Sequence, residues 1–229
     1  YGAYVTLMQN DMKKLIAYSS VSHMGFVTLG IFTLNQTGIE GGILQMINHG
    51  IITGGLFLCI GMIYERTHTR MIEDYGGLVK TVPLYMIFFT IFTLAAIGFP
   101  GLNAFVGEFL IISGAFKANM IIATFSIIGI ILGTSYMVWL YYRVGLNEIN
   151  SSTKPQLVDL EVREIATLMP LVFLVFLIGL QPEILLSYMH VSVEHLLEQI
   201  HNLPIIEEYN ISDSVNLMIQ NLKKYFIWG

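Results

Sequence analysis

The chain has 229 residues, of which 55% are apolar and 12% are charged, and its mean hydropathy is +0.68. A soluble domain carries about a quarter charged residues, so this composition excludes a soluble globular protein and indicates an integral membrane protein. With 11 Lys and Arg against 16 Asp and Glu there is no basic surface for nucleic acid, and the single cysteine excludes an internal disulfide or a cysteine-ligated metal centre.

A helix that crosses a bilayer needs about 20 mostly apolar residues. The first eight residues resemble the end of such a helix, which predicts that the chain begins inside a longer protein. Four complete spans are predicted after it, at residues 15–34, 42–64, 120–142 and 165–181. The expected fold is therefore an all-α, polytopic transmembrane helix bundle.

Residues 83–117 form an apolar stretch that is too long for one straight helix and short for two crossings. At its centre stand Pro100, which lacks a backbone donor, and Gly98 and Gly101, which loosen the chain. If the stretch crosses once, eight Lys and Arg lie on one side of the membrane and only Lys117 lies near the other. If the stretch crosses twice, the Lys and Arg residues are divided more evenly between the two sides of the membrane. Because Lys and Arg gather on the cytoplasmic side, the sequence predicts one discontinuous helix and five spans in all.

Apolar residues recur at helical spacing after residue 181, with Glu and His between them, as at Ile184, Leu185 and Met189. This pattern predicts an amphipathic helix at the outer membrane interface, followed by a peripheral tail. The chain is accordingly divided into a transmembrane domain at residues 1–181 and an interfacial helix and tail at residues 182–229.

Three titratable side chains fall inside the predicted spans, namely His23, His49 and Glu108, while every Lys and Arg and the other carboxylates fall outside. A rise of 1.5 Å per residue places the two histidines about 12 and about 10 Å from opposite membrane surfaces. A carboxylate at such depth costs about 3 kcal/mol to insert, so it needs hydration or a partner. A carboxyl group with two imidazoles and water is suited to a proton relay, which predicts catalytic roles for these three residues.

A purely structural bundle is the plainer alternative. Each histidine alone is also explained by a hydrogen bond between helices, and Glu108 by capping of the helix that restarts after the break. The sequence contains no nucleotide-binding or metalloprotease motif, so we expect neither a bound cofactor nor a metal site in this chain.

Four segments resemble the antiporter-like, proton-translocating membrane subunits of respiratory complex I. They are residues 11–26 (DMKKLIAYSSVSHMGF), 45–50 (QMINHG), 64–70 (YERTHTR) and 105–109 (FVGEF). The first is shared with sister subunits and with cation/proton antiporters, whereas the third is similar to the subunit M family, called subunit 4 in mitochondria. The resemblance extends from residue 1 to about residue 200.

The resemblance implies that Glu108 is the glutamate of the last discontinuous helix, at the proton exit, and that His23 and His49 lie on a central hydrophilic axis. Thr53 stands where sister subunits often carry a lysine, which fits subunit M. The resemblance also implies a longer subunit, whose upstream glutamate and two buried lysines are not in this sequence. NAD, FMN, iron–sulfur clusters and quinone are expected in partner subunits.

The expected function is part of a proton-translocation path in NADH:quinone (ubiquinone) oxidoreductase, a translocase driven by redox chemistry in other chains. The expected partners are neighbouring antiporter-like subunits of the membrane arm and the lipid bilayer, with no nucleic acid. The bacterial plasma membrane is the expected location, with the mitochondrial inner membrane as the alternative. The alternative function is a Mrp-type antiporter subunit that exchanges sodium for protons, which fits residues 64–70 poorly.

Overall fold

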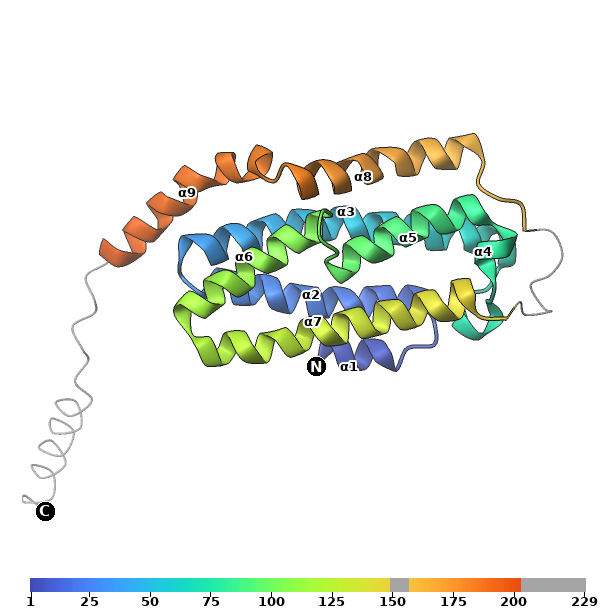
Figure 1. Ribbon diagram of the computed structural model, residues 1–229, viewed down its shortest axis with the longest axis horizontal. Helices are drawn as coiled ribbons and strands as arrows, with labels where there is room; N and C mark the ends of the chain where they lie inside the picture. The colour runs from blue at the N-terminus through green and yellow to red at the C-terminus, as the bar shows by residue number, and fades with distance from the viewer. Residues whose placement is uncertain (149–156, 203–229) are drawn as a thin grey trace, which may run out of the picture. The chain divides into compact units, whose positions relative to one another are not determined.

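The computed structural model describes residues 1–148 and 157–202, and in this part of the chain it contains helices and no strands. The elements in chain order (Figure 1) are α1 (Gly2–Leu7), α2 (Met12–Phe32), α3 (Gln36–Thr67), η1 (Ile72–Asp74), α4 (Leu78–Thr81), α5 (Pro83–Ile97), α6 (Asn103–Ala118), α7 (Met120–Tyr141), η2 (Tyr142–Leu146), α8 (Val162–Leu180) and α9 (Glu183–Asn202). The predicted all-α fold is confirmed.

The residues up to Glu194 form one compact unit, and those from His195 onward belong to a second. The predicted helix after residue 181 is present as α9, whose last turns lie in the second unit. The predicted tail lies outside the described residues. The division at residue 181 and the interfacial position of α9 stay predictions.

Four helices are long and apolar enough to cross a membrane, and they correspond to the four predicted complete spans. α3 begins at Gln36, earlier than the prediction of residue 42, and therefore contains Glu40, which the sequence places outside the spans. The Glu40 side chain is buried, and its Oε1 atom accepts a hydrogen bond from Gln36 Nε2 at 3.0 Å and lies 2.9 Å from His190 Nδ1. These partners explain how a carboxylate that hydropathy alone excludes is accommodated inside the helix.

The helix break lies at residues 98–102, between α5 and α6. α5 ends at Gly98, whose φ of +76° is a left-handed conformation that favours glycine, and Gly101 has a φ of +92°. Pro100 between them cannot continue the hydrogen-bond ladder of α5. The chain resumes helical geometry at Asn103, the first residue of α6.

α6 continues in the direction of α5 (Figure 1), so the two form one interrupted crossing. Contacts along α3 occur in the order that this arrangement requires, because α3 runs antiparallel to the pair. Three glycines mark close contacts between α3 and the α5–α6 pair, because a Cβ added to each would touch a residue of the facing helix. In order along α3, the contacting pairs are Gly38 with Gly114, Gln45 with Gly107, and Gly55 with Phe92. The predicted discontinuous helix is confirmed.

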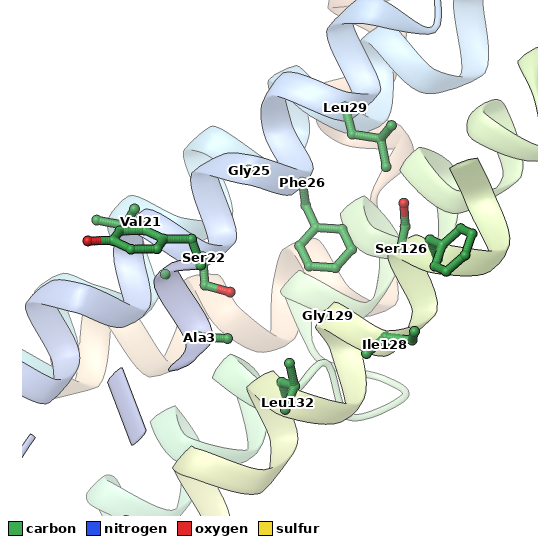
Figure 2. Close-up of a pocket in the computed structure, with 13 residues that line it drawn as sticks. Ala3, Val21, Ser22, Gly25, Phe26, Leu29, Ser126, Ile128, Gly129 and Leu132 are labelled. Atoms are coloured by element: carbon green, nitrogen blue, oxygen red, sulfur yellow. The ribbon is translucent and has the colours of Figure 1, made fainter. Parts of the chain in front are cut away.

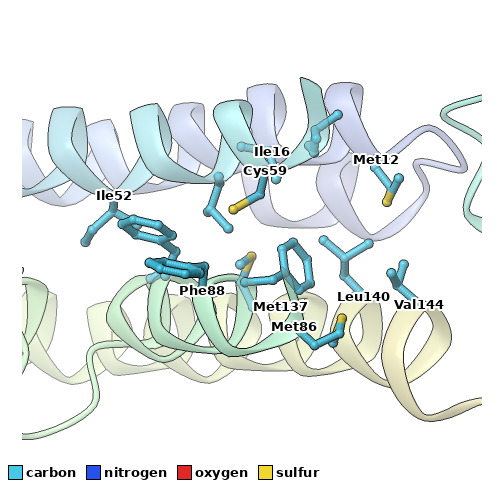
Figure 3. Close-up of a cluster of buried hydrophobic side chains, with 14 of the residues drawn as sticks. Met12, Ile16, Ile52, Cys59, Met86, Phe88, Met137, Leu140 and Val144 are labelled. Carbon is cyan, nitrogen blue, oxygen red and sulfur yellow. The ribbon is translucent and has the colours of Figure 1, made fainter. Parts of the chain in front are cut away.

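The predicted cytoplasmic half of the bundle has an apolar core. Figure 3 shows apolar side chains from α2, α3, α5 and α7 converging between these helices. Those with no exposed surface include Met12, Ile16, Cys59, Met137 and Leu140. These side chains pack closely and contribute no charged group to this part of the described bundle.

Arg66, in the YERTHTR segment, joins the end of α3 to the start of α8. Its guanidinium donates to both carboxylate oxygens of Glu164, at 2.8 and 2.6 Å. It also donates to the Val158 carbonyl at 2.8 Å and to the Asp159 carbonyl at 3.3 Å. The YERTHTR segment therefore contributes a bidentate ion pair at one end of the bundle.

The rest of the same segment is tied to the loop that follows it. The Tyr75 hydroxyl donates to the Thr69 carbonyl at 2.6 Å and lies 2.7 Å from Thr67 Oγ1. Burial raises the pKa of Tyr75 to about 12, so its hydroxyl stays neutral and available as a donor. Arg70 Nε lies 3.6 Å from Asp11 Oδ2, which ties the loop to the start of α2.

Asp159 caps α5, and we expect Asp159→Ala to lower the free energy of unfolding by about 1 kcal/mol. Its carboxylate accepts from the backbone N–H groups of Leu84 and Tyr85, at 2.8 and 2.9 Å, which otherwise have no partner in the first turn of the helix. Thermal unfolding of the purified protein measures the change. Asp159→Asn keeps one acceptor oxygen, so its stability should fall between those of the wild type and Asp159→Ala. Equal stability of Asp159→Ala and the wild type would contradict the capping role of Asp159.

Candidate functional site

The structure brings together the three residues that the sequence singles out. Glu108 Oε1 lies 3.6 Å from His23 Nδ1, and the rings of His23 and His49 have centroids 5.4 Å apart. His23 and Glu108 are buried, and His49 is partly buried. His23 comes from α2, His49 from α3 and Glu108 from α6. Glu108 lies just beyond the helix break. The three side chains are therefore grouped closely, with Glu108 and His49 both beside His23.

Two uncharged side chains complete the polar cluster. Gln45 Nε2 donates to Glu108 Oε1 at 3.3 Å, and the hydroxyl of Tyr136 lies 3.3 Å from His23 Nε2. The sequence gives Gln45 only as a residue one turn from His49. Tyr136 is missed altogether, although it lies more than one turn deeper than the interfacial Tyr141 and Tyr142 and its hydroxyl therefore needs a buried partner.

The helix break contacts the carboxylate of Glu108. A Cβ added to Gly98 would lie 2.6 Å from Glu108 Oε2, closer than any ordinary contact. Glycine is favoured at this position by its left-handed backbone, and a side chain there would displace the Glu108 carboxylate. Irregular backbone at membrane depth is tolerated where it lines a polar site, and here the site is Glu108.

Two small cavities flank His23. One of about 10 Å³ is bordered by Ser19, His49 and Thr53, and a second of about 10 Å³ by Glu108 and Tyr136. Each has room for about one water molecule. Spaces of this size are too small for an organic substrate.

A larger cavity of about 540 Å³ lies between α1, α2 and α7 and is mostly apolar (Figure 2). No His, Asp or Glu lines it, so the acid–base groups are not there. Ser22, Phe26 and Gly129 line both this cavity and the small one at Glu108. A single layer of side chains therefore separates the two. Among the described residues, no three His, Cys, Asp or Glu side chains are arranged to hold a metal ion.

The sequence profile of one protein family, described as NADH:quinone oxidoreductase/Mrp antiporter, TM, matches residues 1–134. The chain belongs to this family. Among antiporter-family relatives, NADH-quinone oxidoreductase subunit M of Rhodobacter capsulatus is 48% identical over 201 residues, which are 88% of this chain and 39% of that protein. NADH-ubiquinone oxidoreductase chain 4 of Marchantia polymorpha is 46% identical over 198 residues, 86% of this chain and 40% of that protein.

Solved structures share the fold of this chain. A chain of respiratory complex I from Thermus thermophilus, solved with bound NADH, matches with a TM-score of 0.81 at 33% identity, over 86% of this chain and 42% of that chain. A chain of the Mrp complex of a Dietzia species matches with a TM-score of 0.76 at 20% identity, over 86% of this chain and 45% of that chain, which shows a shared fold.

This chain thus spans about two fifths of the length of the curated relatives that it matches. Its apolar helices and these relatives confirm the predicted multi-pass inner-membrane location. The roles of the individual site residues stay predictions.

Proposed function

We propose that this chain is part of a membrane-arm subunit of proton-translocating NADH:quinone oxidoreductase and carries a segment of its proton path through His49, His23 and Glu108. The observation that carries this proposal is the close grouping of these three side chains, two of them buried and His49 partly buried, with Glu108 against the break of a discontinuous helix. The names of the relatives supply the enzyme class, since both are subunits of NADH:quinone or NADH:ubiquinone oxidoreductases.

His23 has the geometry of a relay residue, since its ring nitrogens face different partners. Nδ1 faces Glu108 at 3.6 Å, and Nε2 faces the Tyr136 hydroxyl at 3.3 Å. An imidazole that takes a proton on one nitrogen and releases one from the other moves a proton without leaving its place. Because 3.6 Å exceeds the usual hydrogen-bond length of about 2.9 Å, transfer to Glu108 requires a bridging water or a small rotation of the ring.

The redox chemistry belongs to other chains in this proposal. NAD, FMN, iron–sulfur clusters and quinone are held by partner subunits, and neighbouring antiporter-like subunits of the membrane arm flank this one. Redox energy reaches the site through electrostatic coupling, which changes the proton affinity of the relay groups. Glu108 releases its proton toward the outer side of the membrane.

The test of this function is ion transport by the intact complex in sealed vesicles. We expect NADH oxidation to move protons without any requirement for sodium, and a Glu108 variant to move fewer. Transport that depends on sodium and proceeds without NADH would instead support the Mrp-type antiporter. The lower identity of the Mrp chain and the YERTHTR segment both favour the oxidoreductase.

The glycine at the break provides a second test, and we expect Gly98→Ala to reduce proton transport per NADH. Its Cβ would displace the Glu108 carboxylate from its position beside His23. Gly101→Ala is the matched control, because Gly101 also has a positive φ but nothing lies within 4 Å of its added Cβ. Both variants should lose about 1 kcal/mol of stability from backbone strain. Equal proton transport in the two variants would show that the contact between Gly98 and the Glu108 carboxylate does not affect transport.

A further inference from the structure

A buried tyrosine hydroxyl lies against the second ring nitrogen of His23. Tyr136, on α7, has no exposed surface, and its hydroxyl lies 3.3 Å from Nε2 of His23. The other ring nitrogen, Nδ1, faces Glu108. Each nitrogen of the imidazole therefore has its own partner, one from α7 and one from α6.

The Tyr136 hydroxyl has a second neighbour on α2. The side chain of Ser22 interacts with it, and both side chains border the small cavity at Glu108. A hydroxyl oxygen that accepts from Ser22 still has its own proton to donate, and His23 Nε2 is the acceptor beside it. Ser22 thus favours the orientation in which Tyr136 donates to the imidazole.

The two partners of His23 differ in what they can donate and accept. A neutral imidazole holds its proton on one nitrogen and accepts on the other, so the partner of one nitrogen sets the state of both. An ionised Glu108 only accepts, which favours the proton on Nδ1. The Tyr136 hydroxyl donates to Nε2 of the neutral ring and, after rotation about its C–O bond, accepts from Nε2–H of the imidazolium. Tyr136 therefore pairs with both charge states of His23.

We propose that Tyr136 is a positioning residue for the relay, whose hydroxyl holds Nδ1 of His23 toward Glu108 and keeps the proton of the neutral imidazole on Nδ1. The effect on proton transport rests on the proposed function, whereas the state of the imidazole does not. Without the hydroxyl, Nε2 loses this partner, so the ring is freer to turn about its Cβ–Cγ bond and to exchange its proton between the two nitrogens. The plainer alternative is a hydrogen bond that only satisfies a buried tyrosine.

Infrared spectroscopy of the intact complex with ring-labelled histidine tests the state of the imidazole, because the two neutral tautomers absorb at different frequencies. We expect Tyr136→Phe to lose the Nδ1–H band of His23. The same substitution in a His23→Gln background should change no histidine band, which assigns the signal to His23. Ser22→Ala removes only a neighbour of the hydroxyl, so it should weaken the band without abolishing it.

Proton transport by the same complexes in sealed vesicles tests the positioning role. Loss of one hydrogen bond that orients a reacting group should reduce flow along this path about tenfold in Tyr136→Phe. Tyr141→Phe is the matched control, because Tyr141 lies on the same helix and its hydroxyl accepts from Thr90 at 3.0 Å, outside the relay. It should change neither the His23 band nor the number of protons moved per NADH.

Four results would overturn the proposal. They are an unchanged Nδ1–H band in Tyr136→Phe, an unchanged band in Ser22→Ala where Tyr136→Phe does not assemble, a lost band with normal transport, and equal effects of Tyr136→Phe and Tyr141→Phe. Normal transport in Glu108→Gln would instead remove the proposed function. The infrared band would still report whether Tyr136 fixes the imidazole.

Discussion

Replacing Glu108 with glutamine in the intact complex should remove the share of proton transport that passes through this chain. Glutamine keeps the size of the side chain and can still pair with Gln45, but it cannot take up and release a proton. A positioned acid–base group contributes about 10²–10⁴ to the rate of a proton transfer, so flow along this path should fall at least about 100-fold. The measurement is the number of protons moved per NADH oxidised in sealed vesicles.

Two variants make this result specific. Glu108→Asp keeps a carboxyl group but draws it away from His23, so it should retain transport at a reduced rate. Glu40→Gln changes the other buried carboxylate of the α3–α6 pair, whose partners are Gln36 and His190, outside the relay. It should leave proton transport unchanged. Unchanged transport in Glu108→Gln would remove Glu108 from the path.

An infrared titration of the same complex examines the alternative of a purely structural bundle. The proposed relay requires a buried carboxyl group that gains and loses a proton near neutral pH. Its band should be present in the wild type and absent in Glu108→Gln. A spectrum in which no such band titrates would favour the structural alternative, in which Glu108 only stabilises the restart of the helix.

The fold and the line of titratable residues were accessible from the sequence because hydrocarbon penalises charge. This penalty leaves His23, His49 and Glu108 as exceptions, and the uneven distribution of Lys and Arg favours one broken crossing over two. Pro100 and its flanking glycines then mark where the helix is interrupted. Each of these signals is local or compositional, so none requires knowledge of how the helices pack.

The remainder of the site depends on packing and carries a weaker signal. Tyr136 is uncharged, so hydropathy does not distinguish it from ordinary helix residues. Tyr136 approaches His23 only because α7 packs against α2. The burial of Glu40 inside α3 is likewise not predictable from the sequence, since it depends on His190, far away in the sequence.

The largest expected effect on stability follows Arg66→Ala, which should lower the free energy of unfolding by about 3 kcal/mol. Only 17% of the Arg66 side chain and 9% of the Glu164 side chain are exposed, and removing Arg66 leaves the buried Glu164 carboxylate as an uncompensated charge. The Val158 and Asp159 carbonyls lose a donor as well. Thermal unfolding of the purified complex and the amount assembled in the membrane measure the effect.

Arg70→Ala is the matched control, from the same motif. Arg70 is 43% exposed and lies 3.6 Å from Asp11, so its loss should change stability by about 1 kcal/mol or less. Arg66→Lys keeps the charge but not the bidentate hydrogen bonds to Glu164. Its stability should fall between those of the wild type and Arg66→Ala.

The double variant Arg66→Leu/Glu164→Leu separates the penalty of an unpaired charge from the value of the pair itself. It leaves no buried charge, so it should be more stable than Arg66→Leu alone. Equal stability of the single and double variants would show that the other contacts of Arg66 dominate. Because Asp159 accepts from Arg66 and also caps α5, such a result would place the structural role of the motif in the loop before α8.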